Sequence, residues 1–173
     1  MRHVLAAAAA LTLALTAPDA QAQVSGLELN RFDGTWFEIA RSPNDVQKDC
    51  RRAQIDFTPT SRADRYGLTV TCVRAADGRS EILRADARID PDNNAKFRFT
   101  MRGLLSFGGL AGQNYWVYAH APDYSWAILA LPNKSDWWIW HRSQSPSAAV
   151  RSQTLARARQ LGLDTSRVVT TGG

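Results

Sequence analysis

The residues that could carry out catalysis are few and widely separated in this 173-residue chain. Beyond residue 22 there are two histidines, His120 and His141, and neither has a serine, cysteine or carboxylate at the spacing of a nucleophile motif. The glycine-rich stretch 103–112 lacks the lysine of a phosphate-binding loop, and no His, Cys or Asp cluster has metal-ligand spacing. The sequence therefore predicts no catalytic residue, no metal and no cofactor.

The two cysteines, Cys50 and Cys72, are the other reactive groups. An even number of cysteines in an exported protein favours a disulfide, and a hairpin centred near Ser61 would place the two on adjacent strands. Two free thiols are the alternative. The alternation over 66–72 predicts that Cys72 faces inward.

The N-terminus has the pattern of an export signal. Arg2 precedes an apolar run over 4–17, and small residues at 20–22 have cleavage-site spacing. The run is shorter than the roughly 20 residues that a membrane-spanning helix needs. We therefore expect a signal peptide over 1–22 and a single soluble domain over 23–173, periplasmic or secreted. Because the residue after the predicted cut is glutamine and not cysteine, no lipid anchor is expected.

The chain carries a formal net charge of +5. An excess of this size favours contact with anionic lipid or carboxylate ligands more than with nucleic acid. A basic composition without any specific partner is the alternative interpretation.

Short segments rich in β-branched and aromatic residues, separated by Gly, Pro, Asp and Asn clusters, predict an all-β fold. Apolar and polar residues alternate cleanly in several of them, which is typical of strands with one face in a core. Eight strands close a barrel around one small ligand. The predicted strands are 34–41, 52–58, 66–74, 79–89, 95–101, 114–121, 124–131 and 136–142.

A helix is expected between the capping pair Ser145-Pro146 and Gly162. Val150, Thr154, Ala158 and Leu161 fall within one arc of this helix, so it is amphipathic. Strands 114–121 and 136–142 have bulky residues on both faces and need an external cover. The helix is predicted to provide it, and a short last strand is expected over 167–171.

Three motifs carry a family resemblance. The segment 29–41, with a Gly-x-Trp at Gly34 and Trp36, resembles the first lipocalin signature. The segments 114–124 and 139–142 resemble the second and third signatures, in the right order. The likeness extends over 28–171 and is nearest to bacterial outer-membrane lipocalins of the Blc type and to apolipoprotein D.

The resemblance implies an eight-stranded antiparallel up-and-down β-barrel, closed at one end, with a C-terminal α-helix packed outside. It also implies binding, carriage or storage of small hydrophobic ligands in the lumen. The alternative that the resemblance implies is a lipocalin-fold enzyme, an isomerase-like protein that acts on a bound lipid or isoprenoid through an inward thiolate, here that of Cys72. The bacterial relatives are usually anchored through an N-terminal cysteine that this chain lacks, so outer-membrane attachment is not carried over.

At the closed end the resemblance implies a structural pair, with the Arg142 guanidinium stacked on Trp36 near Gly34. Alternation from these residues directs Glu38, Ala40, Trp138 and Trp140 inward. Glu38 is interpreted as a satisfied polar anchor, with a ligand contact as the alternative. The predicted lumen residues are Glu38, Ile55, Phe57, Leu68, Val70, Phe97, Phe99, Met101, Tyr115, Val117, Ala127, Leu129, Trp138 and Trp140.

The loops expected at the open end carry a net charge of +4, and those at the closed end −2. An apolar stretch lies in one of the open-end loops. Basic residues beside apolar ones suggest docking on an anionic membrane, or capture of a fatty acid or lysophospholipid head group. A lid and a homodimer contact are the alternatives. The predicted rim residues are Arg41, Arg52, Arg74, Arg102, Leu104, Leu105 and Phe107.

The leading hypothesis is therefore an exported, diffusible carrier, monomeric or homodimeric, for fatty acids, lysophospholipids or similar amphiphiles, with a role in envelope lipid maintenance. The rivals are the isomerase-like enzyme and a partner-binding module whose lumen is filled by its own side chains.

Overall fold

The computed structural model describes residues 24, 26–102 and 112–172. The predicted signal peptide and the apolar rim residues Leu104, Leu105 and Phe107 lie outside the described residues. The elements are α1 (Leu29–Phe32), β1 (Gly34–Arg41), β2 (Cys50–Pro59), β3 (Arg65–Arg74), β4 (Ser80–Ile89), β5 (Lys96–Met101), β6 (Gln113–His120), β7 (Trp126–Ala130), β8 (Trp137–His141), α2 (Ala148–Gln160) and β9 (Val169–Thr170).

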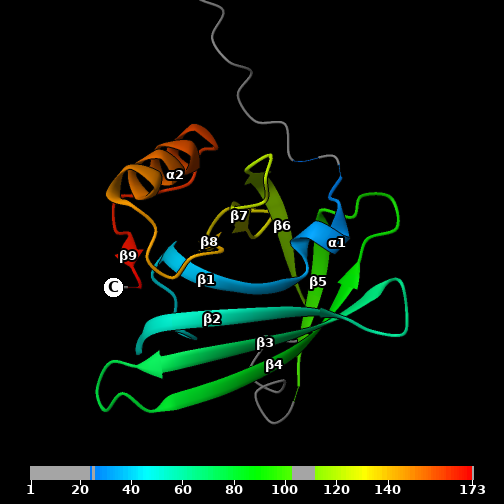
Figure 1. Cartoon of the computed structure of the whole chain (residues 1–173), viewed down its shortest axis with the longest axis horizontal. Coiled ribbons are helices and arrows are strands. Elements are labelled where there is room, and N and C mark those ends of the chain that lie inside the picture. The colour runs from blue at the N-terminus through cyan, green and yellow to red at the C-terminus, as the bar shows by residue number, and fades with distance from the viewer. Residues whose placement is uncertain (1–23, 25, 103–111, 173) are drawn as a thin grey trace, which may run out of the picture.

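The strands form a closed barrel. Each strand from β1 to β7 pairs antiparallel with the next along the chain, and β1 pairs with both β2 and β8. Residues 34–37 of β1 contact β2 and residues 37–41 contact β8, so β1 closes the ring (Figure 1). The short β9 pairs antiparallel with the end of β1, at Ala40 and Arg41. The predicted eight-stranded up-and-down barrel is confirmed, and α1 is a short helix that was not predicted.

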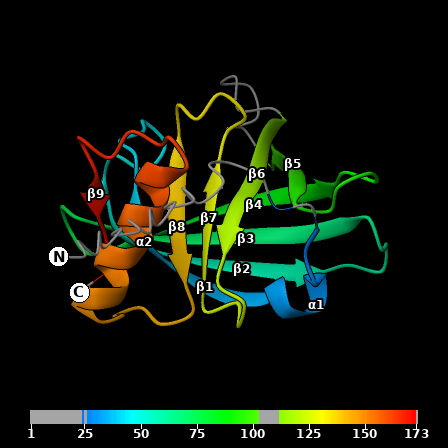
Figure 2. The same cartoon turned by 90° about the horizontal axis from the view of Figure 1, so that it is seen from above.

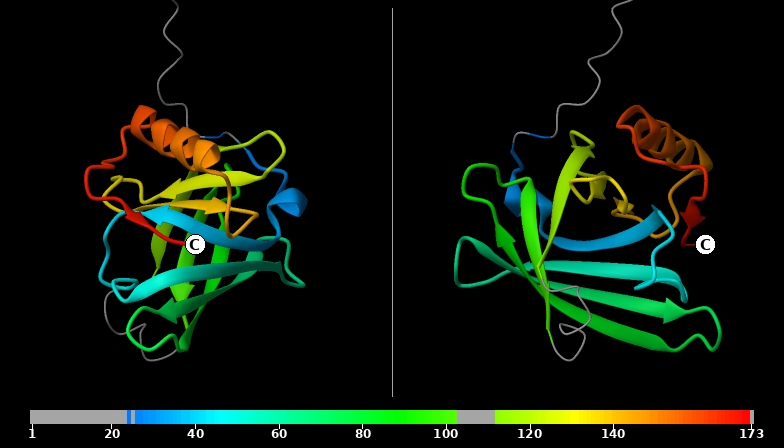
Figure 3. Two further views of the ribbon diagram at one scale, coloured as in Figure 1. Left: turned by 60° about the vertical axis from the view of Figure 1, so that its left-hand side comes forward. Right: turned by 180° about the vertical axis from the view of Figure 1, so that it is seen from behind.

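The C-terminal helix covers one side of the barrel. In Figures 2 and 3, α2 lies across the outside of the strands on the β7, β8 and β1 side. Thr154 and Ala158 are buried there, and Leu161 follows just past the helix. The helix begins later than predicted, because Ser147 and not Ser145 is the N-cap and accepts a hydrogen bond from the Val150 N–H.

Two separate apolar clusters result. One fills the interior of the barrel. The other lies between the outer face of the strands and α2, where Ile128, Trp137 and Ile139 contact Ala158 and Leu161. The neighbours Trp137 and Trp138 thus face opposite sides of β8, as strand geometry requires. The predicted external cover over the bulky strands is therefore present.

A β-bulge in β1 changes which residues face the lumen. Glu38 lies opposite Trp140, whereas Ala40 lies opposite Ile139, so Ile39 is an extra residue in β1. The alternation is reset there, and Ala40, predicted to face inward, packs with Ile39 in the cluster under α2. Arg41 turns inward in its place.

Within the described part of the chain, neither helix is long and apolar enough to cross a bilayer.

Candidate functional site

A cavity of about 120 Å³ lies inside the open half of the barrel. Its walls come from β1, β2, β3, β4, β5, β6 and β8 and from the loop between β1 and β2. Nine of the predicted lumen residues line it: Glu38, Ile55, Leu68, Val70, Phe99, Met101, Tyr115, Trp138 and Trp140. The strands thus give the cavity a mostly apolar wall.

The remaining predicted lumen residues lie below the cavity. Phe57, Phe97, Val117, Ala127 and Leu129 point into the barrel, but they belong to its packed interior and do not line the free space. Phe57 and Phe97 contact each other with ring centroids 5.4 Å apart, and both contact a ring that the sequence analysis did not place, that of Phe32 in α1. These aromatic contacts form the floor of the cavity.

A cation–π contact caps this floor from outside. The Arg142 guanidinium lies 3.6 Å from the centre of the Trp36 ring and donates hydrogen bonds to the carbonyl oxygens of Thr35 and Arg31 at 2.8 and 2.6 Å. The Trp36 indole N–H donates to the carbonyl of Phe32 at 2.8 Å. Gly34 lies two residues before Trp36 and has a φ of +94°, a backbone conformation that favours glycine.

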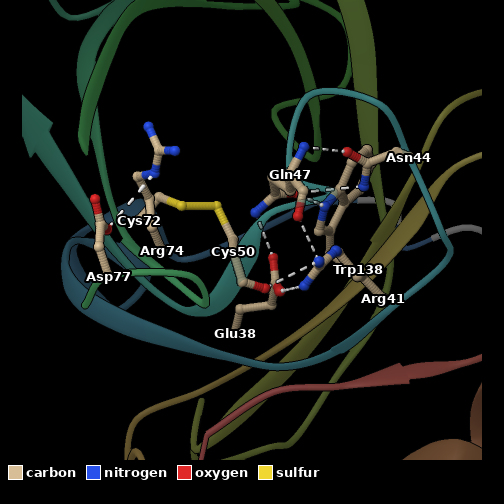
Figure 4. Close-up of a disulfide and its surroundings, with 9 residues drawn as sticks. All are labelled: Glu38, Arg41, Asn44, Gln47, Cys50, Cys72, Arg74, Asp77 and Trp138. Carbon is tan, nitrogen blue, oxygen red and sulfur yellow. Dashed lines mark hydrogen bonds and ion pairs between the residues drawn. A yellow bond between two sulfur atoms is a disulfide. The ribbon is translucent and has the colours of Figure 1, made fainter. Parts of the chain in front are cut away.

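A buried ion pair lies at the other end of the cavity (Figure 4). Arg41 Nη1 is 2.6 Å from Glu38 Oε1, and both side chains are essentially inaccessible to solvent. The second carboxylate oxygen, Oε2, accepts a hydrogen bond of 2.7 Å from the Gln47 amide, and Gln47 Oε1 accepts one of 2.7 Å from the Trp138 indole. Glu38, Gln47 and Trp138 all line the cavity.

The same arginine holds the loop between β1 and β2 against the mouth. Arg41 Nη2 donates to the Gln47 and Cys50 carbonyl oxygens, at 2.5 and 3.2 Å. The Gln47 backbone N–H donates to Asn44 Oδ1, a local turn that carries the loop back into the barrel. This loop therefore forms one wall of the cavity, through Asn44, Val46 and Gln47.

Two ionisable groups of the cavity have shifted pKa values. Burial raises the pKa of the Glu38 carboxyl, and the Arg41 charge and the Gln47 hydrogen bond oppose that shift. Burial, together with the negative charge of Asp136, raises the pKa of Tyr115 to about 12. Tyr115 is therefore a neutral hydroxyl at neutral pH.

Arg41 was predicted as a rim residue, and that prediction is wrong. Its side chain is 2 % exposed, because the bulge at Ile39 turns it into the barrel beside Glu38. Arg52 pairs with Val73 on the side of β2 opposite the cavity-lining Ile55, so it points outward from the wall.

Arg74 and Arg102 are exposed, but each is paired with a carboxylate. Arg74 lies 3.8 Å from Asp77, and Arg102 Nε donates to Asp86 at 2.9 Å. Of the four predicted rim arginines, none is therefore an unpaired cation pointing into the mouth.

The disulfide between Cys50 and Cys72 is confirmed, with the Cα atoms 5.5 Å apart. The expected symmetric hairpin is not what positions it. Ala53 and not Cys50 lies opposite Cys72, because the hairpin is centred between Arg62 and Ala63 and not at Ser61, and Cys50 lies opposite Arg74. The bond ties the end of the β1–β2 loop to β3, directly beside the Glu38 network (Figure 4).

Several cavity residues were missed by the sequence analysis: Asn44, Val46, Gln47, Leu83, Arg84, Ala85, Gln113 and Asp136. Leu83 and Ala85 follow the alternation of β4 and could have been found from it. The loop residues could not, because nothing in strand periodicity says that a loop folds inward.

Comparison with known proteins agrees with this geometry. The family model described as "Lipocalin-like domain" matches residues 27–172. The chain belongs to the lipocalin family.

This lipocalin is similar in sequence to proteins of plants and bacteria. Temperature-induced lipocalin-1 of Arabidopsis thaliana is 28% identical over 148 residues, covering 84% of this chain and 78% of the relative. Outer membrane lipoprotein Blc of Escherichia coli K12 is 27% identical over 159 residues, covering 89% and 84%. Among solved structures, insecticyanin from the tobacco hornworm Manduca sexta matches with a TM-score of 0.65 at 19% identity over 90% of this chain and 85% of that one.

Proposed function

We propose that this lipocalin binds one small amphiphile in its lumen and carries or stores it outside the cytoplasm. The observation that carries the proposal is the cavity of about 120 Å³, enclosed by the barrel and mostly apolar, between the aromatic floor and the Glu38–Arg41 pair. Fatty acids and lysophospholipids are the proposed ligand classes.

The lining favours an amphiphile over a purely apolar molecule. Ile55, Leu68, Val70, Phe99 and Met101 supply apolar wall that suits an acyl chain. Each buried methylene contributes about 0.8 kcal/mol, so even a short chain segment gains appreciable affinity.

Polar side chains also line the cavity, among them Gln47, Gln113 and Asp136. This arrangement supports a ligand whose polar head stays at the mouth while its chain lies below.

The proposed carrier role includes export from the cytoplasm. Two bacterial relatives are named as outer membrane lipoproteins, which supports an envelope location for this chain. The disulfide also suits an oxidising compartment. Envelope lipid maintenance is the corresponding physiological proposal.

The isomerase alternative required a free Cys72 thiolate in the lumen. Cys72 is bonded to Cys50, so the thiol that this hypothesis invoked is not available. We therefore propose a binding protein and not an enzyme.

Native mass spectrometry after incubation with palmitate or lysophosphatidylethanolamine tests the proposal. We expect one ligand per chain. Ala85 is buried and lines the cavity, so Ala85→Phe should fill the space and reduce the bound fraction at least tenfold. The matched control is Ala76→Phe, in the exposed β3–β4 turn, which should bind as the parent does.

Circular dichroism and thermal unfolding show whether Ala85→Phe keeps the fold. A folded Ala85→Phe protein that still binds one ligand with parental affinity would overturn the lumen assignment. Failure of the parent protein to retain either lipid would overturn the proposed function itself.

A further inference from the structure

A second cavity, of about 280 Å³, lies on the outer wall of the barrel, away from the lumen. It is lined by outward residues of β4, β5 and β6 and by the turn that begins at Asp90. Three of its lining residues are cations, Arg88, Lys96 and Arg98, and one is the half-buried Trp116. We call these four residues, with Asp90, the outer groove.

The strand register places like charges directly opposite one another here. Arg98 of β5 lies opposite Arg88 of β4, and Arg88 lies opposite Arg65 of β3. Like charges at directly opposed positions destabilise a sheet. A row of three arginines across adjacent strands is therefore unfavourable for the fold by itself, and an anionic ligand would relieve the repulsion.

The nearby carboxylates neutralise the groove only in part. Asp64 is shared by three arginines, at 3.4 Å from Arg62, 3.4 Å from Arg65 and 4.0 Å from Arg88, and Asp86 pairs with Arg102. Among ion pairs between described residues, none involves Lys96 or Arg98. Asp90 Oδ1 accepts the backbone N–H groups of Asp92 and Asn93, so this carboxylate caps its own turn. Three cations and one acid leave the outer groove with a net charge of +2.

Two contacts hold the cations in place around an aromatic wall. The Lys96 ammonium lies 4.8 Å from the centre of the Trp116 ring. The Arg98 guanidinium lies against Gly112, where a Cβ atom would fall 2.8 Å from the guanidinium carbon. Gly112 has a φ of +78° and thus favours glycine for its backbone as well. The Arg98 guanidinium consequently occupies space that a side chain at residue 112 would fill.

We propose that the outer groove binds a phosphate monoester whose apolar body lies on Trp116. A phosphate monoester carries a charge of about −1.5 to −2 at pH 7, which matches the net charge of the groove. The planar guanidinium presents donors in a fork that suits phosphate oxygens. The indole ring beside Lys96 supplies the apolar surface that distinguishes an ester from inorganic phosphate.

This site is independent of the proposed lumen function. The residues that give the groove its charge, Arg88, Lys96 and Arg98, alternate along their strands with buried residues such as Ile89 and Phe97 and do not line the lumen cavity. Filling the lumen with Ala85→Phe should leave the outer groove unchanged, and the two proposals can fail separately.

The test is titration of the ¹⁵N-labelled protein with 1-naphthyl phosphate, followed by ¹H–¹⁵N correlation spectra. We expect saturable shifts at residues 88–90 and 96–98 and at the Trp116 indole N–H, which Trp116→Phe identifies. The dissociation constant should be about 1 mM or lower. Inorganic phosphate should bind several-fold more weakly, and equal affinity would contradict the role of Trp116.

The decisive variant is Arg88→Gln/Arg98→Gln, which removes two cations that face each other and should therefore not unfold the sheet. Its affinity for 1-naphthyl phosphate should fall at least tenfold. The control is Arg51→Gln/Arg79→Gln, which removes the same charge from exposed residues at the ends of β2 and of the β3–β4 turn. The control should bind as the parent does.

Vesicle sedimentation distinguishes a soluble ester from a lipid head group. Phosphatidic acid vesicles present a phosphate monoester at a surface, and phosphatidylcholine vesicles serve as the blank. Arginine-dependent binding to vesicles alone would assign the groove to a lipid head group, and binding to the soluble ester alone to a metabolite. No saturable shift with either probe up to about 10 mM, or binding unaffected by the Arg88→Gln/Arg98→Gln variant, would overturn the proposal.

Discussion

The two ends of this barrel are stabilised by different interactions. The closed end is packed with aromatic rings, those of Phe32, Trp36, Phe57 and Phe97, and only its outer cap is polar. The open end is held by a buried ion pair, a glutamine and a disulfide. Apolar packing is non-directional, whereas a buried ion pair is strongly destabilising when one partner is lost. The floor should therefore tolerate change better than the mouth.

The comparison also bears on ligand binding. Gln47 and Trp138 belong both to the polar network and to the cavity wall, so a ligand touches the groups that hold the β1–β2 loop. The floor residues Phe57 and Phe97 do not line the free space. Changes at the mouth should alter stability and binding together, and changes at the floor cap should alter stability alone.

The largest effect is expected from Arg41→Leu. This substitution leaves the buried Glu38 carboxylate without its cation and frees the Gln47 and Cys50 carbonyl groups. We expect the free energy of unfolding to fall by about 3–5 kcal/mol in urea denaturation. The double variant Glu38→Gln/Arg41→Leu, which removes both charges, should recover most of the loss. A single variant no less stable than the double one would contradict the importance of the pair.

The next effect is expected from Cys50→Ser/Cys72→Ser. The bond closes a segment with a sequence separation of 22 residues, so its loss should lower the free energy of unfolding by about 2–4 kcal/mol. Amide hydrogen exchange should rise most in the β1–β2 loop and remain slow at the floor. Titration of the parent protein with Ellman's reagent, under denaturing and non-reducing conditions, should find no free thiol. Two reactive thiols would contradict the disulfide.

Arg142→Gln tests the closed end. It removes the cation–π contact with Trp36 and the hydrogen bonds to Thr35 and Arg31 at the partly exposed cap. A loss of about 1–3 kcal/mol in thermal or urea unfolding is expected. Palmitate affinity should be unchanged because the cap does not touch the cavity. Arg79→Gln, at a side chain that is 84 % exposed, is the control, and a binding defect in Arg142→Gln alone would contradict the contrast between the two ends.

The smallest effect concerns Tyr115 and alkaline pH. Its pKa of about 12 exceeds the unperturbed value of 10, so the unfolded chain loses this proton first as the pH rises. Its stabilising contribution is therefore present below pH 10 and is lost between pH 10 and 12. Tyr115→Phe should remove about 1 kcal/mol of the loss seen between pH 8 and pH 11. An unchanged pH profile would show that Tyr115 is not buried as described.

The sequence predicted the barrel well because its strands carry their own signals. Alternation over 95–101 and turn residues between segments are local features, and they placed all eight barrel strands within a few residues. The helix was found from one apolar arc, although its N-cap, Ser147, was misplaced by two residues. That the strands close into a ring was predicted from the three family motifs, because the sequence of a single strand does not determine closure.

The site was less accessible to sequence reasoning, for physical reasons. The bulge at Ile39 inserts one residue into β1 and reverses the facing of every residue after it, which sent Ala40 outward and Arg41 inward. Gln47 reaches the lumen only because its loop folds back on an Asn44 turn. Bulges and inward loops depend on long-range contacts, and alternation along a strand carries no record of them.

The central claim, that the lumen holds the acyl chain, is tested most directly by fluorescence quenching with a brominated fatty acid. Trp138 lines the cavity, whereas its neighbour Trp137 is buried on the opposite face under α2. The parent protein should show saturable quenching of its tryptophan fluorescence. Trp138→Phe should lose a large part of that quenching, whereas Trp137→Phe should be quenched as strongly as the parent. Equal quenching in both variants, or more loss in Trp137→Phe, would contradict lumen binding.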